Sequence, residues 1–298
     1  MTRRFRLEAA TRRGEQIAKQ YGFERFPIEP TTIAEAENIH IQAKPSDQKG
    51  VSGGIIFSGE NVGIFYATDI DNDGFQRFTI GHELGHYFLE GHPEEITKIA
   101  PMHISRAGFS QGKDFIELEA DHFSAGLLMP SRLVKKELLG RPVGLEGILT
   151  LAQQAKCSVT AAAIRAAQCS PYPVAIVVSN GDEISYGFLS DTFKSLGKFR
   201  NFPRKGDKLP VGTTKDFNET PDNVLRARQA CGETTFLDWF DGDKAIELDE
   251  EVIGLGSYGY TLTVFSSDNL PDDPDNDEED EEEARLMDSW TPKFARGR

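Results

Sequence analysis

The residues with the most specific chemistry are two histidines and a glutamate in the pentapeptide HELGH at residues 82–86. On a helix, side chains at positions i and i+4 lie on one face about 6 Å apart, so His82 and His86 are spaced to share one tetrahedral Zn²⁺. Glu83 is turned about 100° around the helix, where its carboxylate could take a proton from a zinc-bound water. The HExxH pattern therefore predicts a metal-dependent hydrolase with Glu83 as its general base.

A second predicted helix, over residues 115–129, offers the third protein ligand. It contains Glu117 and Asp121, which are one turn apart, so Glu117 can bind the metal while Asp121 orients a ligand histidine through its other ring nitrogen. Glu119 is the rival third ligand, on the other flank of the apolar stripe of this helix. Pro130 ends the helix. The two predicted helices together indicate a zinc site.

A zinc peptidase often needs one more hydrogen-bond donor, which stabilises the oxyanion of the transition state. Several histidines and tyrosines near the motif could serve, and each could equally be a surface or supporting residue. The first candidates are His92 and Tyr87, and further ones are His103, His122 and Tyr66.

The segments upstream predict the elements that position the motif. An amphipathic helix is expected over residues 8–22. A second helix should follow, capped by Thr31 or Thr32, and then the strand HIQA at residues 40–43. We therefore expect the chain to begin with a short segment of two helices and one strand.

Two apolar runs between residues 51 and 67 flank the turn sequence SGEN, which predicts a β-hairpin. The HExxH helix should begin at an Asn or Asp cap at residues 72–73 and stop at Gly91. Because the strand at residues 61–67 comes just before this helix, it could pair with an extended substrate by strand addition.

Residues 145–167 have the helix, short turn, helix rhythm of a helix-turn-helix, with Ser158 as the cap of the second helix. Between residues 131 and 168 there are six basic and two acidic residues, a bias that favours DNA contact. The second helix carries only Arg165 for reading base edges, so packing or substrate docking is the better interpretation.

After residue 170 the composition favours strands, with intervening stretches compatible with helix. The expected strands are residues 174–179, 183–189 and 258–265, and the helix-compatible stretches are 222–231 and 236–242.

The chain has 298 residues with 33 basic and 48 acidic ones, a net charge of −15. Eleven of the acidic residues lie between residues 268 and 283, without a basic one, and the remaining 33 basic and 37 acidic residues balance at −4. A run of like charge with few apolar residues cannot bury enough surface to offset its ordering entropy. We therefore expect residues 268–298 to be an acidic disordered tail.

Several classes of protein are excluded. No stretch approaches the roughly 18 apolar residues of a membrane span, and the N-terminus has no apolar segment of signal-peptide length. The three cysteines lack CxxC spacing, and their odd number argues against a disulfide framework. We expect a cytoplasmic protein without membrane contact.

The expected fold class is α+β. The expected organisation is a zincin-like mixed α/β catalytic domain (residues 1–130), a helix-turn-helix-like helical extension (131–170), a C-terminal α+β, sensor-like domain (171–267) and the acidic tail (268–298).

With these residues assembled, the chain resembles the ImmA/IrrE family of bacterial metallopeptidases, which have a gluzincin-like site. The resemblance covers roughly residues 8–168 and rests on PIEPTTIAEAENIHI, RFTIGHELGHYFLEG, ELEADHFSAGLLMPSRL and LAQQAKCSVTAAAIRAA. It implies zinc ligation by His82, His86 and Glu117, with Glu83 catalytic. Many members carry a histidine four residues after the second ligand, where this chain has Glu90. Any accessory role of that histidine falls to His92 or is absent.

The resemblance implies a site-specific endopeptidase that cleaves a helix-turn-helix transcriptional repressor and so induces stress or mobile-element genes. The alternative is a DNA-binding or ligand-sensing transcriptional regulator with a non-catalytic zinc site.

Overall fold

The computed structural model describes residues 2–44, 50–69, 72–106, 115–140, 144–198 and 202–267. Contacts divide these residues into two compact units. The first comprises residues 2–133 with Ala152–Ala161, and the second comprises Val134–Leu151 with residues 162–267. Both contain helices and a sheet, which confirms the α+β class. The expected division into segments 1–130, 131–170, 171–267 and 268–298 stays a prediction. The last of them, the acidic tail, lies outside the described residues.

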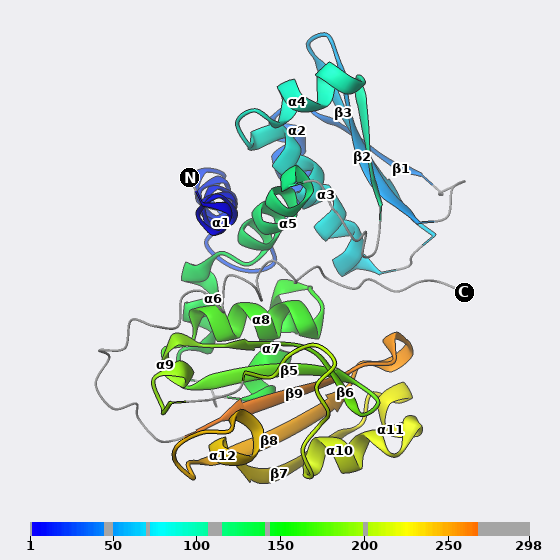
Figure 1. Cartoon of the computed structure of the whole chain (residues 1–298). Helices are drawn as coiled ribbons and strands as arrows, with labels where there is room; N and C mark the ends of the chain where they lie inside the picture. The colour runs from blue at the N-terminus through cyan, green and yellow to red at the C-terminus, as the bar shows by residue number, and fades with distance from the viewer. Residues whose placement is uncertain are drawn as a thin grey trace. The chain divides into compact units, whose positions relative to one another are not determined.

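The first unit holds a four-stranded sheet in the order β1-β3-β2-β4 (Figure 1). The predicted hairpin is confirmed: β2 and β3 pair antiparallel around a turn at residues 59–60, while β3 pairs parallel with β1. The expectation of strand addition to β3 is wrong, because β1 and β2 occupy both of its sides. The edge strands of this sheet are β1 and β4. The strands are β1 His40–Lys44, β2 Val51–Ser58, β3 Asn61–Ala67 and β4 Met102–Arg106.

Five helices belong to this unit, and their starts follow local rules. α2 begins with Pro30 at its first position and Glu29 as its N-cap, not at Thr31 or Thr32, because proline has the φ of a first helical turn and no N–H to leave unpaired. The cap of α3 is Asn72, whose Oδ1 accepts a hydrogen bond from the Phe75 amide at 2.9 Å. The helices are α1 Arg3–Gln20, α2 Pro30–Ala36, α3 Asp73–Phe88, α4 His92–Ile99 and α5 Phe115–Leu128.

The predicted stop at Gly91 is displaced. α3 already ends at Phe88, and Gly91, with φ of 86°, instead precedes α4 as its N-cap. A left-handed residue between two helices lets the chain change direction at once. His92 is thereby placed on a new helix next to the end of α3.

α5 packs between α1 and α3, and α3 in turn packs against β2 and β3 (Figure 1). The shared core includes Ile55 and Ile64 from the sheet and Leu84 and Phe123 from the helices, all almost fully buried.

The contact between α3 and α5 is close because glycines of α3 face α5. A Cβ added to Gly81 would lie 2.5 Å from Ser124 Oγ, and one added to Gly85 would lie 3.1 Å from Ala120 Cα. The backbones can approach only where these side chains are missing. This approach brings the side chains of the HExxH motif within reach of those of α5.

The second unit is built on a five-stranded antiparallel sheet in the order β6-β5-β9-β8-β7 (Figure 1). The three predicted strands are confirmed as β5, β6 and β9, although β9 begins only at Thr261, because residues 256–258 form a 3₁₀ turn. Residues 222–231 form only a short helix, α11, and then continue into strand β7, which pairs with β8. The strands are β5 Val174–Asn180, β6 Glu183–Leu189, β7 Gln229–Thr235, β8 Glu247–Gly254 and β9 Thr261–Ser266.

One face of this sheet packs against aromatic residues of short helices, mainly Phe193, Phe236 and Phe240. On the other face, the amide of Leu145 donates to Glu251 Oε2 at 2.7 Å, so β8 supplies a carboxylate to the first turn of helix α7 (Leu145–Ala155). The helices are α9 Asp191–Lys194, α10 Thr213–Asn218, α11 Pro221–Leu225, α12 Phe236–Phe240 and the 3₁₀ turn η1 Gly256–Tyr258.

The helix-turn-helix rhythm corresponds to two helices, α7 Leu145–Ala155 and α8 Val159–Cys169, which follow α6 Ser131–Leu138. Ser158 is the predicted cap, and its Oγ accepts from the Ala161 amide at 3.1 Å. Arg165 is buried and donates to Gln168 Oε1 at 2.9 Å. The one candidate of α8 for reading DNA bases therefore points into the protein.

None of the helices that the structure describes is long and apolar enough to span a membrane.

Candidate metal centre

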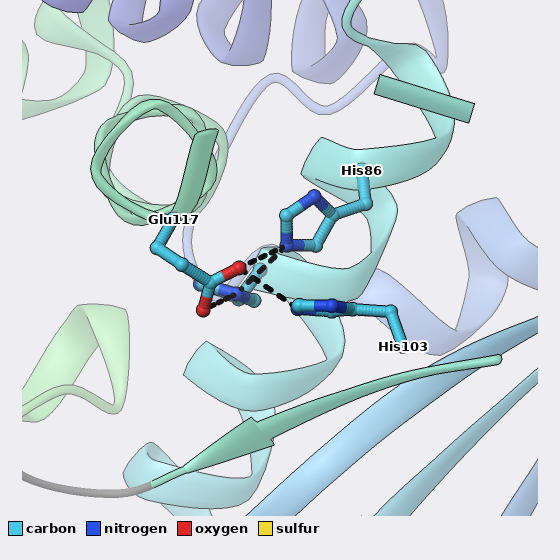
Figure 2. Close-up of side chains that lie close together, drawn as sticks. His86, His103 and Glu117 are labelled. Carbon is cyan, nitrogen blue, oxygen red and sulfur yellow. Dashed lines mark hydrogen bonds and ion pairs between the residues drawn. The ribbon is translucent and has the colours of Figure 1, made fainter. Parts of the chain in front are cut away.

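Three elements bring four ligand-type side chains together: α3 supplies His82 and His86, α5 supplies Glu117, and β4 supplies His103 (Figure 2). One ligand atom from each residue lies within 4.8 Å of all the others. The Nε2 atoms of His82 and His86 are 3.1 Å apart, and Glu117 lies 3.7 Å from His82 Nε2 and 3.2 Å from His86 Nε2. The structure thus places the predicted ligand trio together, and their role as ligands stays a prediction.

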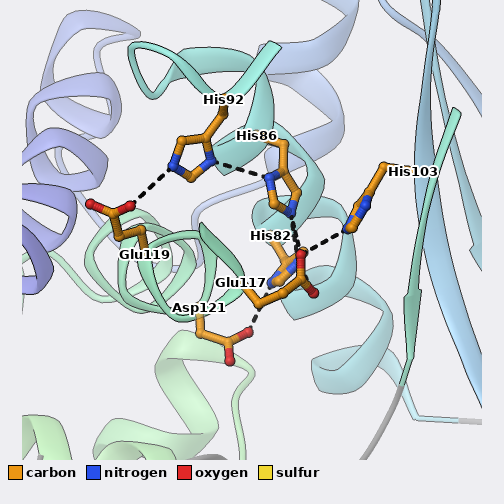
Figure 3. A network of polar contacts seen from close by, with 7 residues as sticks. All are labelled: His82, His86, His92, His103, Glu117, Glu119 and Asp121. Carbon is orange, nitrogen blue, oxygen red and sulfur yellow. Dashed lines mark hydrogen bonds and ion pairs between the residues drawn. The ribbon is translucent and has the colours of Figure 1, made fainter. Parts of the chain in front are cut away.

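The outer nitrogen of His82 faces a carboxylate. His82 Nδ1 lies 2.8 Å from Asp121 Oδ1 in a buried contact (Figure 3). Because an ionised carboxylate can only accept, His82 Nδ1 carries a proton and donates it to Asp121, and Nε2 points into the cluster. This is the orientation expected for Asp121 from its position one turn after Glu117.

The outer nitrogen of His86 faces His92 instead, with 3.1 Å between their Nδ1 atoms. His92 Nε2 lies 3.4 Å from Glu119 Oε2, and Arg6 binds Glu119 with two hydrogen bonds of 2.9 and 2.6 Å. A chain of contacts therefore runs from His86 to α1, and Figure 3 shows its inner part. Glu119 belongs to this chain, and the rival third ligand lies outside the four-residue cluster.

The electrostatics favour a positive charge at the centre. Burial opposes charge on His82, but hydrogen bonds and charge from Asp121 and Glu117 raise its pKa to about 10. Burial lowers the pKa of His86 to about 3. The pKa of Glu117 lies well below its usual range, because contacts with its three histidine neighbours outweigh the effect of burial. A cation among these residues would complement the carboxylates of Asp121 and Glu117.

Glu83 lies beside the cluster and is fully buried. Neither of its carboxylate oxygens has a hydrogen-bond partner within the described part of the chain. Burial raises the pKa of Glu83 to about 7. The group is therefore able to exchange a proton near neutral pH.

His103 was only one of several candidate histidines in the sequence, yet it is the one that reaches the cluster. Its Nε2 lies 2.8 Å from Glu117 Oε1. Its ring meets that of His86 edge-on, with the centroids 4.6 Å apart. The pairing of β4 with β2, which sets His103 opposite Ile55, brings it there.

The other candidates lie elsewhere. The hydroxyl of Tyr87 donates to Glu37 at 3.0 Å, and His122 Nδ1 contacts Thr11 Oγ1 at 3.2 Å on the α1 side of α5. His92 lies behind His86, so it faces a ligand rather than the centre of the cluster. Tyr66 packs against the core and Glu90 is exposed. The structure therefore does not bring Tyr87 or His92 to a position where it could meet an oxyanion.

The residues present fit a zinc ion. Two ligand atoms of a tetrahedral zinc lie about 3.3 Å apart, given zinc–nitrogen bonds of roughly 2.0–2.1 Å. The distances between 2.8 and 3.7 Å in the cluster scatter around this value. His103 Nε2 and Glu117 Oε1 are buried without a hydrogen-bond partner in the described structure, although they are close to each other. A shared cation would satisfy both atoms.

An HExxH helix packed against a helix that supplies a glutamate places this unit in the class of metallopeptidase-like domains. The family model of the IrrE N-terminal-like domain, Peptidase_M78, matches residues 34–167. This match confirms the resemblance to the ImmA/IrrE family over residues 34–167.

No curated protein matches the chain. Among solved structures, a Mycobacterium tuberculosis transcriptional regulator is similar with a TM-score of 0.52 and 14% identity. The similarity covers 87% of this chain and 76% of that one. At this identity the likeness concerns the fold.

Proposed function

We propose that this chain is a zinc-dependent endopeptidase. The observation that carries the proposal is the convergence of His82, His86 and Glu117 beside a buried Glu83 whose oxygens have no hydrogen-bond partner in the described structure. A buried carboxylate without partners is costly unless a ligand or a reaction uses it. The matched family is a peptidase family, which supports the same interpretation.

In this proposal His82, His86 and Glu117 hold the zinc ion, and Asp121 and His92 fix the orientation of the two histidine rings. When bound, zinc would polarise the scissile carbonyl and lower the pKa of the attacking water. Glu83 takes a proton from the water and gives it to the leaving amine. Burial raises the pKa of Glu83, and a raised pKa helps a carboxyl to give back a proton that it has taken.

The edge of β4 is the better place for an extended substrate. In the described sheet β4 pairs only with β2, so its other side offers backbone hydrogen bonds to an added strand. β4 also carries His103, so a strand added there would lie beside the cluster. A substrate held along one short edge strand must be extended at the cut, which favours a narrow choice of sites.

The substrate we propose is a transcriptional repressor of the helix-turn-helix type, cut once. This finer step rests on what the ImmA/IrrE resemblance implies and on the residues that carry it. It is tested by incubating the zinc-loaded full chain with repressors encoded beside its gene and identifying the products by mass spectrometry. One discrete cut, absent with Glu83→Gln, is the expected result. Rapid general degradation of casein would contradict a dedicated substrate.

A second candidate is a transcriptional regulator with a non-catalytic zinc site. The specific observation in its favour is His103, since a centre closed by four protein ligands is typical of structural zinc. The two candidates differ in one result. A regulator of this kind would leave every repressor intact while still binding one zinc ion.

A further inference from the structure

We propose that His103 is a fourth protein ligand of the metal centre in the substrate-free protein, and that hydrolysis requires this side chain to leave. The inference rests on the zinc site of the proposed function. It assigns a role in that site to β4, an element outside the HExxH motif and its partner helix.

The first argument is distance. His103 Nε2 lies 2.8 Å from Glu117 Oε1, and the ligand atoms of all four residues lie within 4.8 Å of one another. A histidine that only stabilises a transition state must leave room for a substrate carbonyl between itself and the ligands. The approach of His103 to Glu117 leaves no such room. The distance therefore fits two ligands of one ion.

The second argument is hydrogen bonding. The short approach between His103 Nε2 and Glu117 Oε1 has no hydrogen-bond geometry, and both atoms are buried. A cation between them would satisfy both atoms at once. Figure 2 shows the imidazoles of His103 and His86 both directed at the carboxylate of Glu117.

The third argument is how β4 is held. His103 pairs with Ile55 of β2, and the neighbouring pair joins Ile104 to Gly54. A Cβ added to Gly54 would lie 2.4 Å from the carbonyl oxygen of His103. β4 can therefore approach β2 at this point only because residue 54 is glycine. This approach helps to set the depth at which His103 enters the cluster.

A fourth protein ligand has a functional consequence. Catalytic zinc sites keep one position open for water and substrate, whereas closed sites have four protein ligands. While His103 is a ligand, the metal has no open position for water and substrate, and the site is inactive. When His103 is displaced, that position becomes available. Because β4 is an edge strand, a substrate that pairs with it would contact the strand that carries the displaceable ligand.

The test measures metal binding, which does not depend on hydrolysis. Zinc-free full chain is titrated with Co²⁺, whose absorption reports the coordination geometry, and its zinc affinity is measured by competition with a chromophoric chelator. His103→Ala should change the Co²⁺ spectrum and weaken zinc binding by about 10- to 100-fold, as loss of a ligand or its support does. His40→Ala, which alters an exposed histidine of β1, should change neither.

Cleavage then separates this proposal from the proposed function. With saturating zinc, His103→Ala should cut the repressor faster than the parent chain, because no protein ligand has to leave before hydrolysis. An unchanged spectrum and affinity together with slower cleavage would overturn the proposal and assign His103 to the transition state. A changed spectrum without cleavage by either protein would support the fourth ligand and contradict the peptidase.

If His103→Ala does not fold, the proposal can still be tested on the unaltered protein. X-ray absorption at the zinc edge of the unaltered protein distinguishes three imidazole ligands from two. Three support the proposal, and two overturn it.

Discussion

Both units hold a carboxylate that is largely shielded from water, but the surroundings of the two groups differ. In the first unit, Glu117 meets three histidines from two other elements, and several atoms of this cluster lack hydrogen-bond partners. In the second unit, Glu250 of β8 is fully buried, and its Oε1 accepts two hydrogen bonds from the amide and the hydroxyl of Thr214, while its Oε2 has no hydrogen-bond partner among the described residues. Thr214 is a neutral donor, and Glu250 belongs to no group of metal-ligating side chains among the described residues. The comparison teaches that convergence of ligand atoms, rather than burial of charge, marks the functional site.

The largest expected effect is on hydrolysis by the first unit. Glu83→Gln should lower the rate of repressor cleavage by about 10²–10⁴-fold, because a general base contributes on this scale. The side chain keeps its volume and does not belong to the ligand trio, so bound zinc should remain. Single-turnover cleavage and metal content together check the prediction. Loss of stoichiometric zinc would mean that Glu83 is itself a ligand.

Removal of the metal should lower the stability of the first unit and leave that of the second unchanged. If free zinc stands at about 1,000 times its dissociation constant, binding stabilises the folded state by about 4 kcal/mol. Chelation should therefore speed amide hydrogen exchange in α3 and α5 and leave β5 and β9 unchanged. Equal acceleration in both units would contradict a metal centre confined to the first.

The buried carboxylate of the second unit should matter for stability only. Glu250→Ala removes the acceptor for the Thr214 amide and hydroxyl and should lower the free energy of unfolding by about 1–3 kcal/mol. Zinc affinity should not change. Glu233→Ala, at an exposed position on the neighbouring strand β7, is the matched control and should shift stability by less than about 0.5 kcal/mol. Denaturant unfolding measures both variants. A loss of zinc from Glu250→Ala would contradict the claim that only the first unit binds the metal.

A further comparison concerns the residues behind the ligands, where the smallest effect should be that of Arg6→Ala. Asp121→Asn weakens the acceptor of the His82 ring proton and should reduce zinc affinity by about 10- to 100-fold. Arg6→Ala acts on His86 only through Glu119 and His92, and its side chain is partly exposed. We expect it to change zinc affinity less than Asp121→Asn does. The reverse order, measured by chelator competition, would contradict the assigned geometry.

The motif and its partner helix were predictable because their signals are local. Spacing along one helix places His82 and His86 on one face, and the same rule links Glu117 with Asp121. The choice between Glu117 and Glu119 was not local, because it depends on which face of α5 packs against α3. Gly81 and Gly85 determine that contact, and Arg6 of α1 binds Glu119 on the other side.

His103 and the edges of the sheet could not be predicted in the same way. The place of His103 depends on the register between β4 and β2, which joins residues nearly fifty positions apart. The parallel pairing of β1 with β3 likewise closes the strand expected to receive a substrate. In the second unit, pairing with β8 makes a strand of residues 229–235, part of which was compatible with helix. Long-range pairing decided each case against the local signal.

The most direct test of the central claim is the zinc content of the purified full chain after dialysis against a weak chelator. We expect one zinc ion per chain in the parent protein and in Glu83→Gln, and none in His86→Ala. A parent chain without zinc, or zinc retained by His86→Ala at full stoichiometry, would contradict a metal centre built on His82, His86 and Glu117.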